Sequence, residues 1–348
     1  MRLSHRRMFE PKYTITSTLL ANIKRIAEIV ASLNERRFPR VVLFEMERVA
    51  REISAHASTS IEGNPLPLTD IKRILKQVPH RVRDSEREVL NYNEALLWLK
   101  KHSDFEVAVV DLQTLLDTHR LVTKELLPDF SSGVLRTAPV FVNDPQIRQT
   151  VFWPPDHADV PRLIENLLEF SNAKKEEIDP LILAGIFHKQ FVLIHPFMDG
   201  NGRTVRLLTT SLLAALGVDI FRLFSFERYY NANVTKYFAK VGERGSYYDL
   251  TVDFTPWLEY FTDGVLDELI RVKELLEKRM KDPSSGMKDH HRIILAYLRE
   301  HPSINDMIYA TLVDRAKATR ALDFRFLLDQ KLIERQGRGR ATYYTLKT

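Results

Sequence analysis

Apolar residues recur at helical spacing along most of this chain. From Thr14 to Arg36, Ile, Leu and Val fall on one face of a helix, and Pro39 breaks the pattern. Similar spacing predicts further helices at 41–61, 70–78, 86–99, 108–126, 181–194, 203–216 and 257–276. We therefore expect a mainly α-helical protein.

One internal segment, 133–153, has a strand-like pattern instead. Val140, Phe141 and Val142 form one β-branched and aromatic run, and 151–153 form another. The turn-like residues 143–145 lie between them. The pattern predicts a β-hairpin, which by itself would be an ordinary surface hairpin.

The C-terminal part reads as a compact unit after a linker-like stretch at 281–286. Helices are predicted at 290–300, 304–312 and 316–328, and strand alternation at 331–346 follows. This order is the pattern of a winged helix. Its basic residues are Lys317, Arg320, Lys331, Arg335, Arg338 and Arg340. They could bind nucleic-acid phosphates, but a module that packs on the core or contacts protein is slightly favoured, because no base-reading set is evident.

Composition narrows the class of protein. The 348 residues are 44% hydrophobic and include no cysteine, which excludes a disulfide framework and a thiolate metal site. No apolar run is long enough to span a membrane, and the basic N-terminus lacks the apolar core of a signal peptide. The net charge of +5 does not require a nucleic-acid partner. We expect a cytoplasmic protein without membrane contact.

The most informative segment is His195-Pro-Phe-Met-Asp-Gly-Asn-Gly-Arg-Thr-Val-Arg206. Asp179 and Pro180 suit the cap and first turn of the preceding helix, and Gly217 suits the end of the following one. The segment is therefore predicted to be a loop between two buried helices. Its two glycines let the backbone approach a ligand closely.

The side chains of this loop suit chemistry on a nucleotide triphosphate. The start of the second helix favours phosphate, and Arg203 and Arg206, three residues apart, project toward the same anion. Asp199 is a hard oxygen ligand of the kind that Mg²⁺ uses. His195 can accept a proton from a hydroxyl near neutral pH.

The run resembles the signature of the Fic family, His-Pro-Phe-x-Asp/Glu-Gly-Asn-Gly-Arg-x-x-Arg, at every fixed position. The resemblance implies AMP transfer from ATP to a hydroxyl of a target protein. It makes His195 the general base and Asp199 the Mg²⁺ ligand, and it assigns the γ-phosphate to Arg206. The residues that it implies for ATP and its phosphates are Gly200, Asn201, Gly202, Arg203, Thr204, Val205 and Arg206.

A second motif, Ser58 to Asn64, ends the predicted helix 41–61. Ser58 and Glu62 lie four residues apart, on one helix face. Alone this is an ordinary helix end. Beside the loop it resembles the family's inhibitory motif, Ser/Thr-x-x-x-Glu-Gly/Asn, which implies that Glu62 pairs with Arg206 and hinders the γ-phosphate. Glu62 could also orient a water that removes AMP.

The resemblance also assigns the hairpin and an aromatic pair. Val140, Phe141 and Val142 would be a flap strand that binds the target segment by strand addition. Tyr237 and Phe238 would line an adenine pocket; equally, they could be core residues.

We therefore expect a helical Fic core with a β-hairpin flap and a C-terminal winged helix. The predicted parts are an inhibitory helical region at 1–100, the catalytic core at 101–280 and a winged-helix-like domain at 287–348. The expected function is autoinhibited transfer of AMP from ATP, with Mg²⁺, to Tyr, Thr or Ser of a target protein or of the chain itself, with AMP removal as a possible second activity. A homodimer is plausible. The alternative is a DNA-binding regulator whose Fic core only senses nucleotide.

Overall fold

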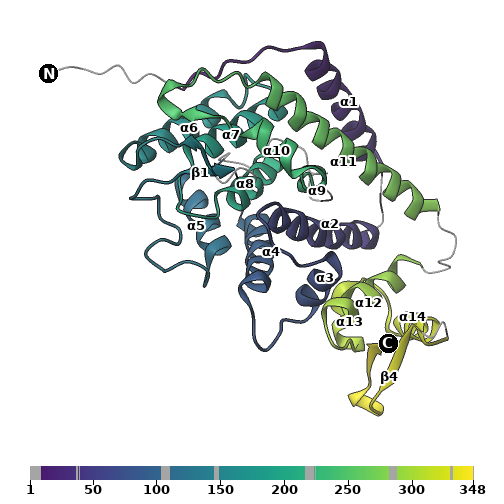
Figure 1. The fold of residues 1–348 in the computed structure, drawn as a ribbon. Coiled ribbons are helices and arrows are strands. Elements are labelled where there is room, and N and C mark those ends of the chain that lie inside the picture. Colours follow the sequence, from purple (N-terminus) through teal and green to yellow (C-terminus); the bar gives the residue numbers. More distant parts are fainter. Residues whose placement is uncertain are drawn as a thin grey trace. The chain divides into compact units, whose positions relative to one another are not determined.

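The structure is a computed structural model, and it describes residues 9–36, 38, 40–102, 110–144, 149–215, 223, 225–281, 288–329 and 332–347. Helices account for most of the described residues (Figure 1). The predicted mainly α-helical class is therefore confirmed. By contacts the chain divides into two compact units, one of 1–35 with 50–272 and the other of 36–49 with 273–348. The three-part division at 1–100, 101–280 and 287–348 stays a prediction.

The first unit contains most of the helices. They are α1 (Ser17–Asn34), α3 (Leu68–Lys76), α4 (Asp84–His102), α5 (Leu112–Thr123), α6 (Val160–Lys174), α7 (Pro180–Ile194), α8 (Asn201–Ala215), α9 (Glu227–Ala232) and α10 (Val234–Val241). Helices α2 (Arg40–Ile61) and α11 (Thr255–Lys281) each contribute a part to both units. Short 3-10 turns lie at His157–Asp159, before α6, and at Tyr247–Asp249, after α10.

Helix α7 is the centre of this core, because nearly all of its residues are buried. Asp179 caps it by accepting from the N–H of Leu181 at 2.9 Å, and Pro180 occupies its first turn, as the sequence predicts. The helix packs against α6 and α8, and Figure 1 shows α7 and α8 side by side. The indole of Trp257 donates to the carbonyl of Gly185 at 2.8 Å, and a Cβ at Gly185 would lie 2.6 Å from a methyl carbon of Leu258 and 3.2 Å from the ring of Phe261. Residues of α11 thereby pack directly against the N-terminal half of α7.

The predicted hairpin is confirmed as β1 (Val142–Asp144) and β2 (Gln149–Trp153), which pair antiparallel with a register shift after Val142. Residues Phe152 and Trp153 of β2 also pair in parallel with β3 (Gly245–Ser246). Val140 and Phe141 lie before β1, so the first strand begins later than predicted. Residues 145–148, which include part of the predicted turn, lie outside the described residues.

The C-terminal elements of the second unit follow the predicted order. They are α12 (Asp289–Glu300), α13 (Asp306–Leu312), α14 (Lys317–Asp329), β4 (Ile333–Gln336), a 3-10 turn (Gly339–Ala341) and β5 (Tyr343–Leu346). Strands β4 and β5 pair antiparallel, from Ile333 with Leu346 to Gln336 with Tyr343. A buried cluster that includes Ile294, Tyr309, Phe324 and Leu327 forms the core. The name winged helix stays a prediction.

Part of the predicted basic surface forms ion pairs within this unit. Arg320 donates to both carboxylate oxygens of Asp306, at 2.8 and 2.9 Å. Lys317, Arg335 and Arg338 are exposed. Lys331 lies outside the described residues, as do residues 282–286 of the predicted linker. Among the described helices, none is long and apolar enough to cross a membrane.

Candidate active site

The motif loop lies between the end of α7 and the start of α8. Helix α7 ends at Ile194, and His195 then takes a left-handed conformation with φ 49° and ψ 62°. This conformation is uncommon for a residue with a Cβ and is often found at functional sites. The chain turns there, and α8 begins at Asn201. The first turn of α8 therefore faces the loop with backbone N–H groups.

His195 is partly buried and has a defined tautomer. Its Nδ1 lies 3.3 Å from the carbonyl oxygen of Val192, which can only accept, so Nδ1 carries the proton. The Nε2 atom is then unprotonated and can accept one. Burial lowers the pKa of His195 below its ordinary value of 6.5, although the carbonyl contact opposes this shift. The imidazole is thus neutral at neutral pH, the form that a general base requires.

Asn201 binds the loop itself. Its amide group donates to the carbonyl of Phe197 at 2.9 Å and accepts from the N–H of Phe197 at 2.9 Å. The side chain is buried, and both ends of its amide are used. The side chain of Asn201 thus closes the loop, and its role as a phosphate ligand stays a prediction.

His119 of α5 also holds the loop, and no local sequence pattern pointed to it. Its Nδ1 accepts from the N–H of Gly133 at 2.9 Å, so its Nε2 donates to the carbonyl of Asp199 at 3.0 Å. The ring also stacks on Phe197 with a centroid distance of 3.6 Å. Burial lowers the pKa of His119 to about 4, so the ring is neutral at neutral pH.

Gly200 is required by both its conformation and its surroundings. Its φ is +75°, in the left-handed region, and a Cβ there would lie 2.9 Å from a methyl carbon of Thr123 on α5. Helix α5 therefore packs directly against the glycine-rich turn.

Asp199 lies at the accessible edge of the loop, and Arg203 lies buried beside it. The Asp199 carboxylate is 63% exposed and accepts from the N–H of Gly200 at 2.5 Å. Arg203 is buried, with Nη2 3.3 Å from Asp199 and Nη1 3.4 Å from Glu88. Its Nε and Nη1 have no hydrogen-bond acceptor among the described residues. Buried donors without an acceptor are costly, so these atoms suit an anionic ligand.

Arg206 is fully buried and is held by the end of α2. Its Nε donates to the hydroxyl of Ser58 at 2.8 Å, and its Nη2 donates to the Ser58 carbonyl at 2.9 Å and to the Glu62 carboxylate at 2.7 Å. Burial opposes the charge of Arg206, but Glu62 and other partners raise its pKa above the ordinary value. The structure thus brings together Ser58, Glu62 and Arg206, as the resemblance to the inhibitory motif implies.

Glu62 also lies directly against the backbone of α8. A Cβ built on Gly202 would lie 2.1 Å from Oε1 of Glu62 and 2.9 Å from Nη1 of Arg206. The carboxylate therefore lies at the first turn of α8, at the kind of helix N-terminus that binds anions. Gly63, at φ +95°, follows Glu62 directly and allows the chain to turn just after α2 ends at Ile61.

A buried chain of hydrogen bonds continues from Arg206 into the core. Thr209 donates to the carbonyl of Val205 at 2.7 Å, so its oxygen accepts from Nδ1 of His188 at 3.0 Å. The Nε2 of His188 then accepts from the hydroxyl of Tyr237 at 3.1 Å, and that hydroxyl accepts from Nη1 of Arg206 at 3.5 Å. Burial lowers the pKa of His188 well below 6.5, which keeps it neutral.

The predicted adenine pair is divided between core and surface. Tyr237 is 1% exposed and stacks on Tyr230 with a centroid distance of 4.9 Å. Phe238 is 46% exposed. Only Phe238 therefore presents an accessible ring, and Tyr237 acts as a core residue behind Arg206.

Thr204 and Val205 differ in what their side chains could offer a phosphate, because Oγ1 of Thr204 has no hydrogen-bond partner among the described residues, whereas Val205 has no polar side-chain atom. Both side chains are fully buried, and the N–H of Thr204 already donates to the Gly200 carbonyl at 3.0 Å. The ATP contacts of these two residues stay predictions.

Arg136 connects the motif loop to the hairpin, and sequence reasoning missed it. Its Nε donates to the carbonyl of His195 at 2.8 Å, and its backbone N–H donates to the carbonyl of Pro196 at 2.9 Å. The segment that leads to Phe141, whose side chain is 56% exposed, is thereby fixed beside the loop.

Comparisons with known proteins agree with this geometry. Residues 109–213 match the model of the Fic/DOC family, and the resemblance inferred from 195–206 is confirmed. The curated relatives include Protein adenylyltransferase Fic from Aedes aegypti, 29% identical over 220 residues, and its namesake from Culex quinquefasciatus, 30% identical over 220 residues. Each match covers 58% of this chain and 42% of the relative. The chain thus spans less than half the length of these proteins.

Solved structures share the fold. A Fic family protein from Desulfovibrio desulfuricans is similar with a TM-score of 0.65 and 22% identity, over 97% of this chain and 98% of that chain. Fic-1 from C. elegans is similar with a TM-score of 0.57 and 21% identity, over 76% of this chain and 74% of that chain. These likenesses confirm the fold of the Fic core.

Proposed function

We propose that this protein transfers AMP from ATP to the hydroxyl of a Tyr, Thr or Ser side chain, on a target protein or on itself. The contact of Glu62 with both Arg206 and the backbone at Gly202 carries the further proposal that the enzyme is autoinhibited. The names of the curated relatives support the reaction class. The defined tautomer of His195 supports a working general base rather than a nucleotide sensor.

In the proposed step, the acceptor oxygen forms a bond to the α-phosphorus of ATP. The bond from that phosphorus to the bridging oxygen of the β-phosphate breaks, and pyrophosphate leaves. Nε2 of His195 takes the proton of the hydroxyl. General base catalysis of this kind contributes about 10²- to 10⁴-fold in rate.

The rest of the loop supplies positioning and charge. The N-terminus of α8 and the buried donors of Arg203 suit the phosphates of ATP. Asp199 fits Mg²⁺, because it is a hard oxygen ligand that is mostly exposed at this edge. Bound Mg²⁺ would neutralise charge on the triphosphate. Phe238 is the accessible ring for contact with the adenine.

The proposed inhibition is a competition for Arg206. Ser58 satisfies Nε and shares Nη2 with Glu62, and Glu62 adds a charged contact at 2.7 Å. A γ-phosphate that needs Arg206 must first displace this carboxylate, because both anions prefer the same guanidinium face. When Glu62 moves aside, Ser58 still orients Arg206. Glu62 could also orient a water for AMP removal, which would be a second activity of the same site.

The test is intact-mass analysis after incubation with ATP and Mg²⁺, with and without a cell lysate. Glu62→Gln removes the charge but keeps the side-chain volume, and we expect on the order of 10-fold more AMP adduct, equivalent to about 1.4 kcal/mol of lost competition. Adding His195→Ala should abolish the adduct. Glu35→Gln, at the end of another helix, serves as the matched control.

An unchanged rate in Glu62→Gln would refute autoinhibition, provided that the wild-type rate is measurable. No adduct in any variant, together with salt-dependent DNA binding, would instead favour the DNA-binding regulator. A homodimer stays a prediction.

A further inference from the structure

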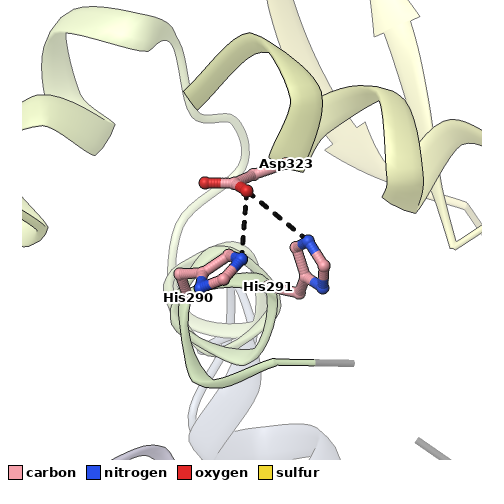
Figure 2. A group of neighbouring side chains, drawn as sticks. All are labelled: His290, His291 and Asp323. Atoms are coloured by element: carbon pink, nitrogen blue, oxygen red, sulfur yellow. Dashed lines mark ion pairs between the residues drawn. The ribbon is translucent and has the colours of Figure 1, made fainter. Parts of the chain in front are cut away.

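A second group of chemically active side chains lies in the C-terminal unit, away from the motif loop in sequence. His290 and His291 come from the first turn of α12, and Asp323 comes from α14. Figure 2 shows both imidazole rings beside the same carboxylate. The side chains are 14%, 6% and 3% exposed, respectively, so all three are largely withdrawn from water. Burial of three such groups together requires a physical reason.

The spacing of the three groups matches that of ligands around a metal ion. Oδ1 of Asp323 lies 3.1 Å from Nε2 of His290 and 3.6 Å from Nε2 of His291. All three candidate ligand atoms lie within 4.8 Å of one another. Metal–ligand distances of about 2.0–2.1 Å in a tetrahedral site place neighbouring ligand atoms about 3.3 Å apart. One ion could therefore contact these atoms with small side-chain movements.

The surroundings hold the ligand groups in place. The other oxygen of Asp323, Oδ2, accepts from the hydroxyl of Tyr309 at 2.8 Å and lies 3.0 Å from Nε of Arg315. His291 stacks on Phe326 with a centroid distance of 4.1 Å. Partners of this kind around metal ligands orient them and tune their basicity. The arrangement leaves Oδ1 as the oxygen that faces both histidines, although Nη2 of Arg315 also contacts it at 3.2 Å.

The protonation state of the rings is compatible with ligation. Burial lowers the pKa of both histidines, that of His291 to about 4, so each ring is neutral at neutral pH. Nδ1 of His291 now accepts from the N–H of Lys288 at 3.2 Å, so its proton is on Nε2. Metal binding through Nε2 would move that proton to Nδ1 and end the contact with Lys288. We therefore expect binding to alter the start of α12.

We propose that Nε2 of His290, Nε2 of His291 and Oδ1 of Asp323 bind one divalent transition-metal ion of the zinc class, with a water as fourth ligand. Two imidazoles and one carboxylate favour such an ion over Mg²⁺ or Ca²⁺, which prefer oxygen ligands. The ion would join α12 to α14 and stabilise the C-terminal unit. Arg315 already balances the charge of Asp323, so the affinity should be lower than that of a site with four protein ligands.

The test is calorimetric titration of the full chain with ZnCl₂, with Mg²⁺ in excess so that oxygen sites are occupied. We expect the titration to show heat from binding. In a separate thermal melt, Zn²⁺ should raise the unfolding temperature of the protein. His290→Gln and His291→Gln should each remove this event. His301→Gln is the matched control, because His301 is an exposed histidine of the same unit at the end of α12 and should leave the event unchanged.

A second measurement separates loss of the site from loss of the fold. Co²⁺ bound to a four-coordinate site with two nitrogen ligands absorbs in the visible range and can report binding. Tyr309→Phe should lower the affinity of the site for Co²⁺ about 10-fold, while the helical circular dichroism stays the same. The proposal is overturned if wild type binds no Zn²⁺. It is also overturned if folded His290→Gln and His291→Gln bind Zn²⁺ as wild type does, since the ion would then lie elsewhere.

Discussion

Glu62 and Arg206, separated by 144 positions in the sequence, form a contact of 2.7 Å at the first turn of α8. The same carboxylate oxygen fills the space that a Cβ on Gly202 would need. One acidic side chain therefore meets both the guanidinium and the backbone that suit a phosphate. This relationship makes the helix end of α2 part of the site, and it leads to the first predictions.

Replacing Ser58 with Ala should lower the stability of the protein. The hydroxyl accepts from Nε of Arg206 at 2.8 Å, and its loss leaves a buried guanidinium N–H without that acceptor. The expected decrease in the free energy of unfolding is about 1–3 kcal/mol, measured by urea denaturation. Ser60→Ala, two residues along on the same helix, is the control. Equal urea midpoints for the two variants would show that the contact contributes nothing to the free energy of unfolding.

Gly202→Ala should displace Glu62 without producing an active enzyme. The new Cβ would overlap Oε1 of Glu62, but it would also occupy the space at the helix terminus where phosphate would lie. We expect AMP transfer to stay low, and the double variant with Glu62→Gln to be no more active than Gly202→Ala alone. ATP binding by calorimetry should be weakened in both. A double variant as active as Glu62→Gln would contradict this assignment of the phosphate position.

The rate of AMP transfer should fall only at acidic pH. Burial lowers the pKa of His195 below 6.5, and the base acts when neutral, so activity is present above the folded pKa and lost as pH falls through it. The measurement is kcat/KM against pH in the Glu62→Gln background, with Mg²⁺ in excess. A midpoint at or above 6.5 would argue against His195 as the base in the environment described.

His119→Phe should loosen the motif loop while keeping the ring that stacks on Phe197. The substitution removes the contacts with the N–H of Gly133 and the carbonyl of Asp199. An unsatisfied buried N–H costs about 1–3 kcal/mol, so stability should fall by that amount. In the Glu62→Gln background, kcat should decrease with little change in KM, because the loop positions the base. His80→Phe, at an exposed site, should change neither.

The sequence was informative where the physical rules are local. The cap at Asp179 and Pro180, the end of α2 shortly before Gly63 and the loop from His195 to Asn201 all follow from short-range backbone preferences. The predicted helices therefore lie within a few residues of the observed bounds, whereas α6, α9 and α10 had no counterpart in the prediction. The first strand is the exception, because Val140 and Phe141 are strand-like by type but precede β1, whose bounds depend on pairing with β2.

Roles assigned to single side chains were less predictable. Asn201 suits a phosphate by type, yet its amide binds the backbone of Phe197. Tyr237 suits base stacking by type, yet it is buried behind Arg206. In both cases the residue type permits several partners, and the packed neighbours select one.

By itself the sequence determined the helical class and the loop that carries His195, and the resemblance added the pairing of Glu62 with Arg206. Tertiary structure decided which distant groups complete the site. His119 and Arg136 fix the loop, and His290, His291 and Asp323 meet only when α12 packs on α14. The reason is physical: helical periodicity and capping act over a few residues, whereas contacts between elements depend on how whole helices pack.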